Sequence, residues 1–393
     1  MYKMSKIKTT RDMVFFLSAV ITFSVLPLLS KVAIGSESDG IYQFRHKQIL
    51  IENRGGLEFK SDKKIYSNEL VNLNGHNHAI NIRGDNINNP VILYLHGGPG
   101  WPVLPYAYKF SRLWEKDFTV VHWDQRGAGK THCANPKYNP VDARFEDFLS
   151  DTEAVVGYLR EKLGQKKIII LGHSWGSLLG VHFVKNHPNA VAAYVGTGQI
   201  AFNWEQEKAG YDFALGQAYA RNDEDAIQRL ESLSPYPDVG KYMDKMEVQR
   251  DYIIRYGGAL VNRDNYMDYY YSAFFESPDY TLSDWVCAFD AMQNYYHEAL
   301  EERQYSKDSD IGNLPALGLD FDVPVFFFLG AHDQHISSRI GIEYFRDIKA
   351  PHKRLVLFDG SAHAPPIEQP EEFYRALRDY VLPLATRNRT MVE

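Results

Sequence analysis

The sequence predicts an α/β fold in which a mostly parallel sheet is interrupted by a helical insertion. Four segments carry continuous apolar runs without polar alternation, as is typical of parallel strands covered on both faces: NNPVILYLHGGPG, FTVVHWDQRG, KKIIILGHSWG and AVAAYVGTGQ. Between residues 199 and 321 this pattern stops, and a segment rich in tyrosine and acidic residues indicates several helices. Two further apolar runs, VPVFFFLGAHD and KRLVLFDGSAH, then resume the strands.

The elements on either side of these runs complete the predicted order. Residues 40–85 contain short extended runs broken by Gly, Asn and Asp, which predict antiparallel strands joined by tight turns. Residues 145–164 have helical spacing and end in glycine, and PEEFYRALRDYVLPLA predicts a closing amphipathic helix. We therefore divide the chain into an N-terminal segment (1–35), a core in two parts (40–199 and 322–385), a helical insertion (200–321) and a polar tail (386–393).

The composition limits the possible partners. The chain has 393 residues, of which 45% are hydrophobic and 24% are charged, and its formal net charge is −7. This balance is typical of a globular protein with a sizeable core and gives no reason to expect a nucleic-acid partner.

The N-terminal segment has the pattern of an export signal. A basic stretch precedes the apolar run MVFFLSAVITFSVLPLL, and Ala33 and Gly35 then stand at the −3 and −1 positions of a cleavage site before Ser36. The alternative is an uncleaved membrane anchor, but the run is slightly short for a bilayer span and Pro27 interrupts it. We favour cleavage, and with it an extracytoplasmic protein whose only membrane contact would be an uncleaved N-terminus.

The two cysteines leave their state open. Cys133 and Cys287 could form one disulfide in an oxidising compartment or remain free thiols, and their positions in the sequence do not decide between these states. Neither lies in a metal-ligand spacing, so we expect no metal and no other cofactor.

The motif GHSWG, residues 172–176, predicts a nucleophilic serine. It fits G-x-S-x-G with a buried strand before it and a helix after it, the context in which Ser174 would project from the edge of the sheet. The flanking glycines would be required because side chains there would collide with the neighbouring strand and helix. The alternative is a glycine-rich turn that contains a serine by chance.

A serine nucleophile needs a histidine base and an acidic group that orients the base. Asp333 and His363 each follow one of the last two predicted strands, in the order Ser, Asp, His that this arrangement uses. Asp359 is a weaker candidate for the acid, and His173, His332 and His335 are expected to pack nearby or to lie at the surface. For the oxyanion, the backbone N–H groups of Trp175 and of Gly98, in HGGPG, are the predicted donors.

Together, HGGPG, WDQRGAGKT and GHSWGS resemble the proline iminopeptidase family of α/β-hydrolase serine peptidases. The resemblance implies an eight-stranded sheet with a helical cap between strands 6 and 7, and a triad of Ser174, Asp333 and His363. It also implies that Asp124 and Arg126 of WDQRG are structural. Family peptidases hold the substrate's free amine with glutamates of the cap, which makes Glu205 and Glu207 candidates for substrate binding, although the family's cap motif does not align here.

These observations predict an exported serine hydrolase that releases N-terminal residues from short peptides. A carboxylesterase or amidase acting on small acyl substrates is the first alternative, and a non-catalytic binding protein on the same fold is the second. The partner would thus be a small peptide or another small acyl compound, and the sequence gives no oligomeric state.

Overall fold

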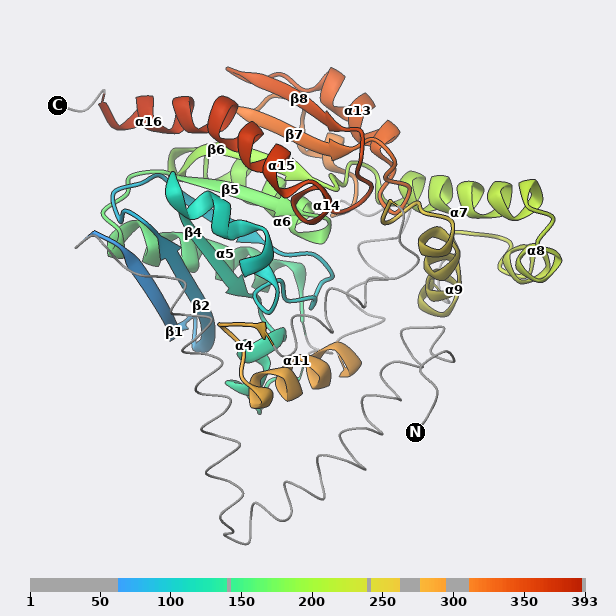
Figure 1. The fold of residues 1–393 in the computed structure, drawn as a ribbon, viewed down its shortest axis with the longest axis horizontal. Helices are drawn as coiled ribbons and strands as arrows, with labels where there is room; N and C mark the ends of the chain where they lie inside the picture. Colours follow the sequence, from blue (N-terminus) through green and yellow to red (C-terminus); the bar gives the residue numbers. More distant parts are fainter. Residues whose placement is uncertain (1–62, 140–142, 239–241, 262–275, 295–310, 391–393) are drawn as a thin grey trace, which may run out of the picture.

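The computed structural model describes residues 63–139, 143–238, 242–261, 276–294 and 311–390. Its centre is one eight-stranded sheet with the order β1-β2-β4-β3-β5-β6-β7-β8 (Figure 1). The strands are β1 (Ile65–Leu73), β2 (His76–Gly84), β3 (Val91–Leu95), β4 (Thr119–Asp124), β5 (Ile168–His173), β6 (Val191–Thr197), β7 (Val325–Gly330) and β8 (Lys353–Phe358).

Strand directions confirm the predicted fold class. The β1–β2 and β2–β4 pairs are antiparallel, and every other neighbouring pair from β4 to β8 is parallel. The turn between β1 and β2 is formed by Asn74 and Gly75, which both have positive φ angles, so the hairpin predicted there is also confirmed.

Helices cover the sheet, and the last of them follow strand β8. The helices of the core are η3 (Ala107–Lys109), η4 (Ser111–Lys116), α4 (Gly129–Cys133), α5 (Phe145–Lys162), α6 (Trp175–Asn186), η6 (Pro188–Ala190), α13 (Ser338–Asp347), α14 (Pro365–Glu368), α15 (Pro370–Ala376), η8 (Leu377–Val381) and α16 (Leu382–Thr390). Because α16 reaches Thr390, the segment expected to be a polar tail from residue 386 begins inside a helix. A polar helix end lacks the apolar spacing by which a sequence reveals a helix.

The predicted export signal, residues 1–35, lies outside the described residues. Within the described ranges, none of the helices combines the length and the apolar character needed to cross a membrane.

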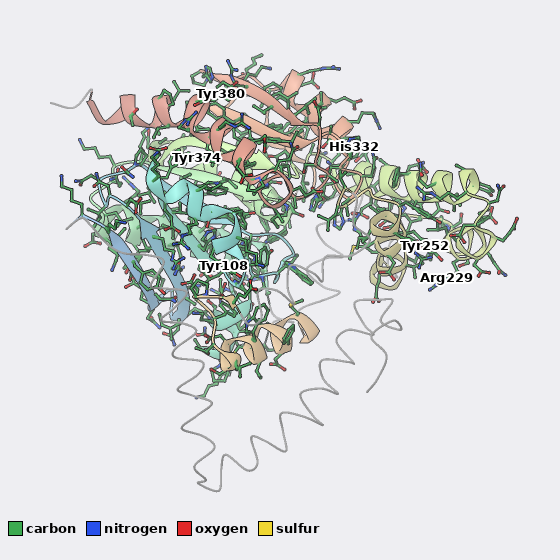
Figure 2. All side chains as sticks on the ribbon, in the orientation of Figure 1. Tyr108, Arg229, Tyr252, His332, Tyr374 and Tyr380 are labelled. Carbon is green, nitrogen blue, oxygen red and sulfur yellow. A yellow bond between two sulfur atoms is a disulfide. The ribbon has the colours of Figure 1, made fainter. Side chains whose placement is uncertain are left out.

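Between β6 and β7 the chain forms the helical cap. Its described elements are α7 (Asn203–Ala220), α8 (Glu224–Glu231), α9 (Tyr242–Arg255), α11 (Leu282–Asn294) and η7 (Leu314–Leu317). Helices α7, α8 and α9 extend away from the sheet, whereas α11 lies beside α4 of the core (Figure 1). The extended helices share a small apolar core, and arginines cover its tyrosines, as for Arg229 over the ring of Tyr252 at 5.9 Å (Figure 2).

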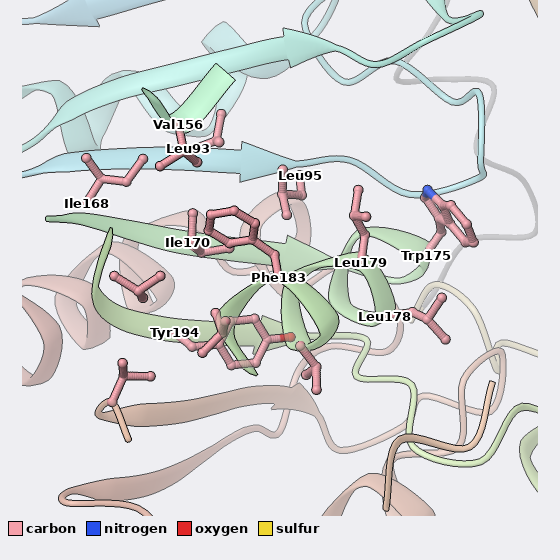
Figure 3. Packing of buried hydrophobic residues seen from close by; sticks show 14 of the residues in the cluster. Leu93, Leu95, Val156, Ile168, Ile170, Trp175, Leu178, Leu179, Phe183 and Tyr194 are labelled. Carbon is pink, nitrogen blue, oxygen red and sulfur yellow. The ribbon is translucent and has the colours of Figure 1, made fainter. Parts of the chain in front are cut away.

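Alternate residues of the central strands serve two different hydrophobic clusters. Leu93 and Leu95 of β3 pack into one cluster with side chains of α5 and α6 (Figure 3). Ile92 and Tyr94 of the same strand belong to the other cluster, with residues of η4 and α15. Both faces of the sheet are therefore buried, which is why these strands have no polar alternation in the sequence.

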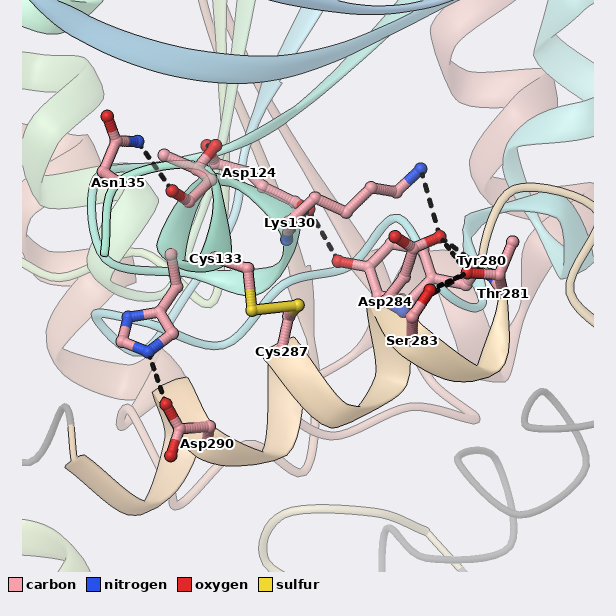
Figure 4. Close-up of a disulfide and its surroundings, with 12 residues drawn as sticks. Asp124, Lys130, Cys133, Asn135, Tyr280, Thr281, Ser283, Asp284, Cys287 and Asp290 are labelled. Carbon is pink, nitrogen blue, oxygen red and sulfur yellow. Dashed lines mark hydrogen bonds and ion pairs between the residues drawn. A yellow bond between two sulfur atoms is a disulfide. The ribbon is translucent and has the colours of Figure 1, made fainter. Parts of the chain in front are cut away.

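A disulfide joins the cap to the core. Cys133 ends α4 and Cys287 lies in α11, and their Cα atoms are 5.4 Å apart although 154 positions separate them in the chain (Figure 4). The pairing that the sequence left open is thus present. Polar contacts support the same junction, because Tyr280 donates a hydrogen bond to Asp124 at 2.6 Å and His132 lies 2.7 Å from Asp290.

We expect reduction of this disulfide to destabilise the protein by about 2–4 kcal/mol, because the bond closes a long loop of the unfolded chain. The measurement is the urea midpoint of the oxidised and the reduced protein. A Cys133→Ser/Cys287→Ser variant is the control and should unfold at the lower midpoint with or without reductant. An unchanged midpoint of the native chain on reduction would contradict the expectation.

Candidate active site

Ser174 occupies a sharp turn between β5 and α6. Its backbone has φ 54° and ψ −124°, a conformation that non-glycine residues rarely adopt. The Ser174 N–H donates to the carbonyl of Thr197 at 3.0 Å, which fixes the turn against the end of β6. The serine therefore stands where the strand ends and the helix begins, as the motif predicts.

Close backbone packing explains the two glycines of the motif. A Cβ atom on Gly176 would overlap the carbonyl oxygen of Leu95, and one on Gly172 would overlap that of Gly176. The absence of a side chain at Gly176 lets α6 approach β3, and its absence at Gly172 lets the start of α6 approach β5. This agrees with the steric reason predicted from the sequence.

The predicted acid and base are in direct contact. Asp333 follows β7 and His363 follows β8, and the Nδ1 atom of His363 lies 2.8 Å from Oδ2 of Asp333. Both side chains are buried. Because a carboxylate only accepts, the contact places the proton on Nδ1 and leaves the lone pair of the neutral ring on Nε2, the atom that a general base needs.

His363 and the Ser174 turn adjoin the same short segment after β6. Thr197 accepts the hydrogen bond from Ser174, and a Cβ atom on the next residue, Gly198, would come within 2.7 Å of Cε1 of His363. The ring centroid of His173, which precedes the serine, lies 4.8 Å from that of His363. The structure thus brings the three predicted residues to one edge of the sheet.

The loop that carries His363 is fixed mainly by Glu368. Its Oε2 accepts hydrogen bonds from the Ser361 hydroxyl at 2.7 Å and from the Ala362 N–H at 2.9 Å. Its Oε1 accepts from the N–H of Val261, in the cap, at 2.6 Å. One carboxylate therefore connects the base loop to the cap.

The cap also holds the backbone on both sides of the Asp333–His363 pair. The carbonyl of Gly258 accepts from the N–H groups of Gln334 and His335 at 2.8 and 3.1 Å. The next carbonyl, that of Ala259, accepts from the N–H of His363 at 2.9 Å. The residues after α9 thus bridge the acid loop and the base loop.

The loop predicted to supply an oxyanion donor lies against the serine. A Cβ on Gly97 would lie 3.1 Å from Cβ of Ser174, while Gly98 has φ +115° and gives the loop its bend. Trp175 is the first residue of α6, so its N–H is at a helix N-terminus, where negative charge is favoured. The roles of Gly98 and Trp175 as donors remain predictions.

Gln125 connects this loop to the helix of the elbow. Its N–H donates to Nε2 of His96 at 3.0 Å, its side-chain amide donates to the His96 carbonyl, and its Oε1 accepts from the Trp175 indole at 3.2 Å. Burial lowers the pKa of His96 to about 4, so its ring is neutral and can accept. Gln125 lies within WDQRG, but no pattern in the sequence indicated this role.

Asp124 and Arg126 have the structural roles that the resemblance implies. Asp124 accepts from the Lys130 N–H at 2.9 Å and from Tyr280 of the cap. Arg126 makes two hydrogen bonds to the carboxylate of Asp151, at 2.7 and 2.8 Å. Both side chains hold neighbouring segments together.

The two cap glutamates predicted to bind the substrate's amine lie in different surroundings. Glu207 is buried, and its carboxylate already forms an ion pair with Arg250 and accepts from Tyr236 at 2.9 Å. Its negative charge is therefore used inside the cap, where it joins α7 to α9. Glu205, on the same helix, is exposed to solvent.

His335 was expected at the surface or in a supporting position, and the sequence did not indicate which residue its ring would contact. The structure stacks its ring on that of His363, with centroids 4.4 Å apart. Its position two residues after Asp333 was visible in the sequence, but no pattern indicated which way the side chain faces. Across the described ranges, no group of three or more His, Cys, Asp or Glu side chains is arranged to hold a metal ion.

Comparisons with known proteins agree with this fold. Residues 90–370 match the sequence model of the family described as alpha/beta hydrolase fold. The probable aminopeptidase YbaC of Bacillus subtilis (strain 168) is 26% identical over 298 residues, which cover 75% of this chain and 90% of that protein. A proline iminopeptidase of Heyndrickxia coagulans is 22% identical, with 81% of this chain and 99% of the relative covered.

A solved structure, the proline iminopeptidase of Mycobacterium smegmatis, superposes with a TM-score of 0.57 at 20% identity. The match covers 82% of this chain and all of that one, and at this identity it supports the fold alone. The family match, by contrast, spans well over half of the sequence and includes the elbow, the acid and the base. The chain therefore belongs to the alpha/beta hydrolase fold family.

Proposed function

We propose that this protein is a serine hydrolase in which Ser174, Asp333 and His363 form a catalytic triad. The observation that carries the proposal is the buried hydrogen bond between His363 and Asp333, at the same sheet edge as the strained turn of Ser174. A structural histidine would not require an acidic partner, a glycine facing its ring and a nucleophile turn at the same edge of the sheet. The arrangement supports a base that is oriented toward the serine.

The chemistry follows from these positions. Nε2 of His363 takes the proton of the Ser174 hydroxyl as the oxygen attacks the carbonyl carbon of the substrate, and Asp333 stabilises the imidazolium that forms. His363 then donates the proton to the leaving group, which leaves an acyl-enzyme. His363 then takes a proton from a water molecule as the water attacks this ester. It returns the proton to the Ser174 oxygen as the acid is released, which regenerates the serine and the neutral base.

The negative charge on the attacked carbonyl oxygen requires donors. The N–H of Trp175 and the loop containing Gly98 flank the serine, and a pair of such donors contributes a few kcal/mol of transition-state stabilisation. The hydrogen bonds of Gln125 to His96 and Trp175 keep the loop and the helix in register. We therefore propose that the backbone N–H groups of Gly98 and Trp175 form the oxyanion hole.

For the substrate, we propose a short peptide with a free N-terminal amine. The support is the similarity to relatives named probable aminopeptidase and proline iminopeptidase, at 26% and 22% identity over most of this chain. Because Glu207 is paired with Arg250, the amine would have to be held by groups other than that glutamate. A carboxylesterase or amidase acting on small acyl substrates is the alternative.

We also propose that the protein is exported and that its N-terminal segment is removed. The sequence pattern of residues 1–35 supports this, and so does the disulfide between Cys133 and Cys287, since structural disulfides persist in oxidising compartments. Cys133 is exposed, so a reducing environment would have access to the bond.

Placing a methyl group at Gly198 should displace His363 and abolish most activity. The new Cβ would lie 2.7 Å from Cε1 and 2.9 Å from Nδ1 of the ring, so we expect Gly198→Ala to lower kcat/KM by about 100-fold or more. The matched control is Gly164→Ala: that glycine also has a positive φ, +61°, but its Cβ would meet nothing within 4 Å. If the two variants lose activity to a similar extent, the loss comes from the strain of an alanine at positive φ and not from contact with His363.

A panel of chromogenic substrates should separate the two hydrolase classes. The proposed aminopeptidase cleaves aminoacyl arylamides with a free amine and loses rate when that amine is acylated. Ser174→Ala should lower either activity by at least about 10⁴-fold and prevent labelling by a fluorophosphonate probe. Equal or faster cleavage of blocked substrates or of simple p-nitrophenyl esters would favour the esterase. An unlabelled native chain would count against a serine hydrolase altogether.

Expression of the full chain in a bacterial host should yield an exported protein whose intact mass corresponds to a start at Ser36. Replacing Ala33 and Gly35 by arginine should block this processing, because the cleavage site requires small residues. Retention of the full-length native chain in the membrane fraction would instead identify the segment as an anchor.

A further inference from the structure

Three histidine rings pack together: that of the predicted base, His363, and those of His335 and His173. The ring of His335 stacks on that of His363 with a centroid distance of 4.4 Å and an angle of 24° between the planes. The ring of His173 is tilted by 45° at a distance of 4.8 Å. The predicted triad requires only one of these imidazoles, so the close face-to-face contact of His335 needs its own explanation.

We propose that His335 is a positioning residue, whose flat ring keeps the imidazole of His363 in the plane from which Nε2 reaches Ser174. This inference rests on the proposed serine hydrolase and assigns a residue that the triad does not include. His335 would touch neither the substrate nor the reacting atoms. It would act only through His363.

The need for such a contact follows from the geometry of the base. The hydrogen bond to Asp333 holds His363 at Nδ1, but the ring can still pivot about that atom and move Nε2 away from the serine. Stacking against a second flat ring opposes this rotation, since aromatic pairs prefer a defined distance and angle. A misalignment of about 1 Å at the reacting atoms can reduce a rate by about 100-fold.

The position of His335 is set by its backbone and not by its side chain. Its N–H donates to the carbonyl of Gly258, and its own carbonyl accepts from Nη1 of Arg250 at 2.8 Å. Arg250 is in turn paired with Glu207 on α7. The cap therefore presents the ring of His335 to His363, and a change of the side chain leaves these backbone contacts in place.

The surroundings of His335 favour packing over proton transfer. Its Nδ1 is buried and has no hydrogen-bond partner among the described residues. The charged or titratable groups that face it are Arg250 from α9, His363 and His173. Burial, the positive charge of Arg250 and the two histidines hold the pKa of His335 well below its usual value, so the ring is neutral at physiological pH.

The test compares a flat and a branched side chain at position 335. His335→Phe keeps a planar ring without nitrogen atoms, whereas His335→Leu fills a similar volume without a plane, and His335→Ala removes the side chain. The control is Arg339→Ala in α13: this side chain is exposed and pairs with Glu343 of the same helix. For each variant we would measure kcat, KM, the rate of fluorophosphonate labelling and Tm.

We expect His335→Leu and His335→Ala to lower kcat and the labelling rate by about 10-fold, with KM within twofold of the native value. His335→Phe should restore both rates to within about threefold, and Arg339→Ala should leave them unchanged. If a fluorophosphonate labels the native chain and the leucine and alanine variants keep the native rates, the role of His335 is overturned but the proposed function is not. The same holds for a phenylalanine variant as slow as the leucine variant, or for a failure of both nonplanar variants to fold. A native chain that no fluorophosphonate labels would instead overturn the proposed function.

Discussion

The hydrogen bond between Asp333 and His363 depends on two loops that belong to different strands being held in register. Parallel pairing of β7 with β8 brings the loops to one edge of the sheet. The N–H of His332 then donates to the carbonyl of Ser361 at 3.0 Å, and Gly330 approaches Ala362 so closely that it has no room for a side chain. The pair is thus a consequence of strand packing, which is why its residues lie in the loops that follow two neighbouring strands.

Much of the fold and of the site could be predicted because the signals are local. The turn at Ser174 requires a glycine on either side, an apolar strand before it and an apolar helix face after it. All of these residues lie close together in the sequence. Asp333 could be located because it follows β7, which is buried on both faces and therefore continuously apolar. His363 follows β8, an edge strand that is only partly buried but still contains the apolar run LVLF. The helical cap was visible as the stretch in which these runs are missing.

Other features depended on contacts that no local pattern contains. Glu207 was predicted to bind substrate, but the packing of α9 against α7 places Arg250 on its carboxylate. The pairing of Cys133 with Cys287 required α11 to lie against α4, an arrangement between segments 154 positions apart. His335 was noticed beside Asp333, but its orientation depends on carbonyls at the end of α9. In each case the deciding partner belongs to the cap, whose helices carry weaker signals than the strands.

These contacts make the cap part of the framework that holds the proposed catalytic residues. One end is bonded to the core through the disulfide and through Tyr280 on Asp124. Another end supplies Gly258 and Ala259 to the loops of the acid and the base, and Val261 to Glu368, which orders the base loop. If the cap holds the substrate of the proposed hydrolase, a change in it that moves these carbonyls also moves the loops that orient His363. Cap substitutions in such a protein should affect kcat together with KM, because the same backbone segment serves both tasks.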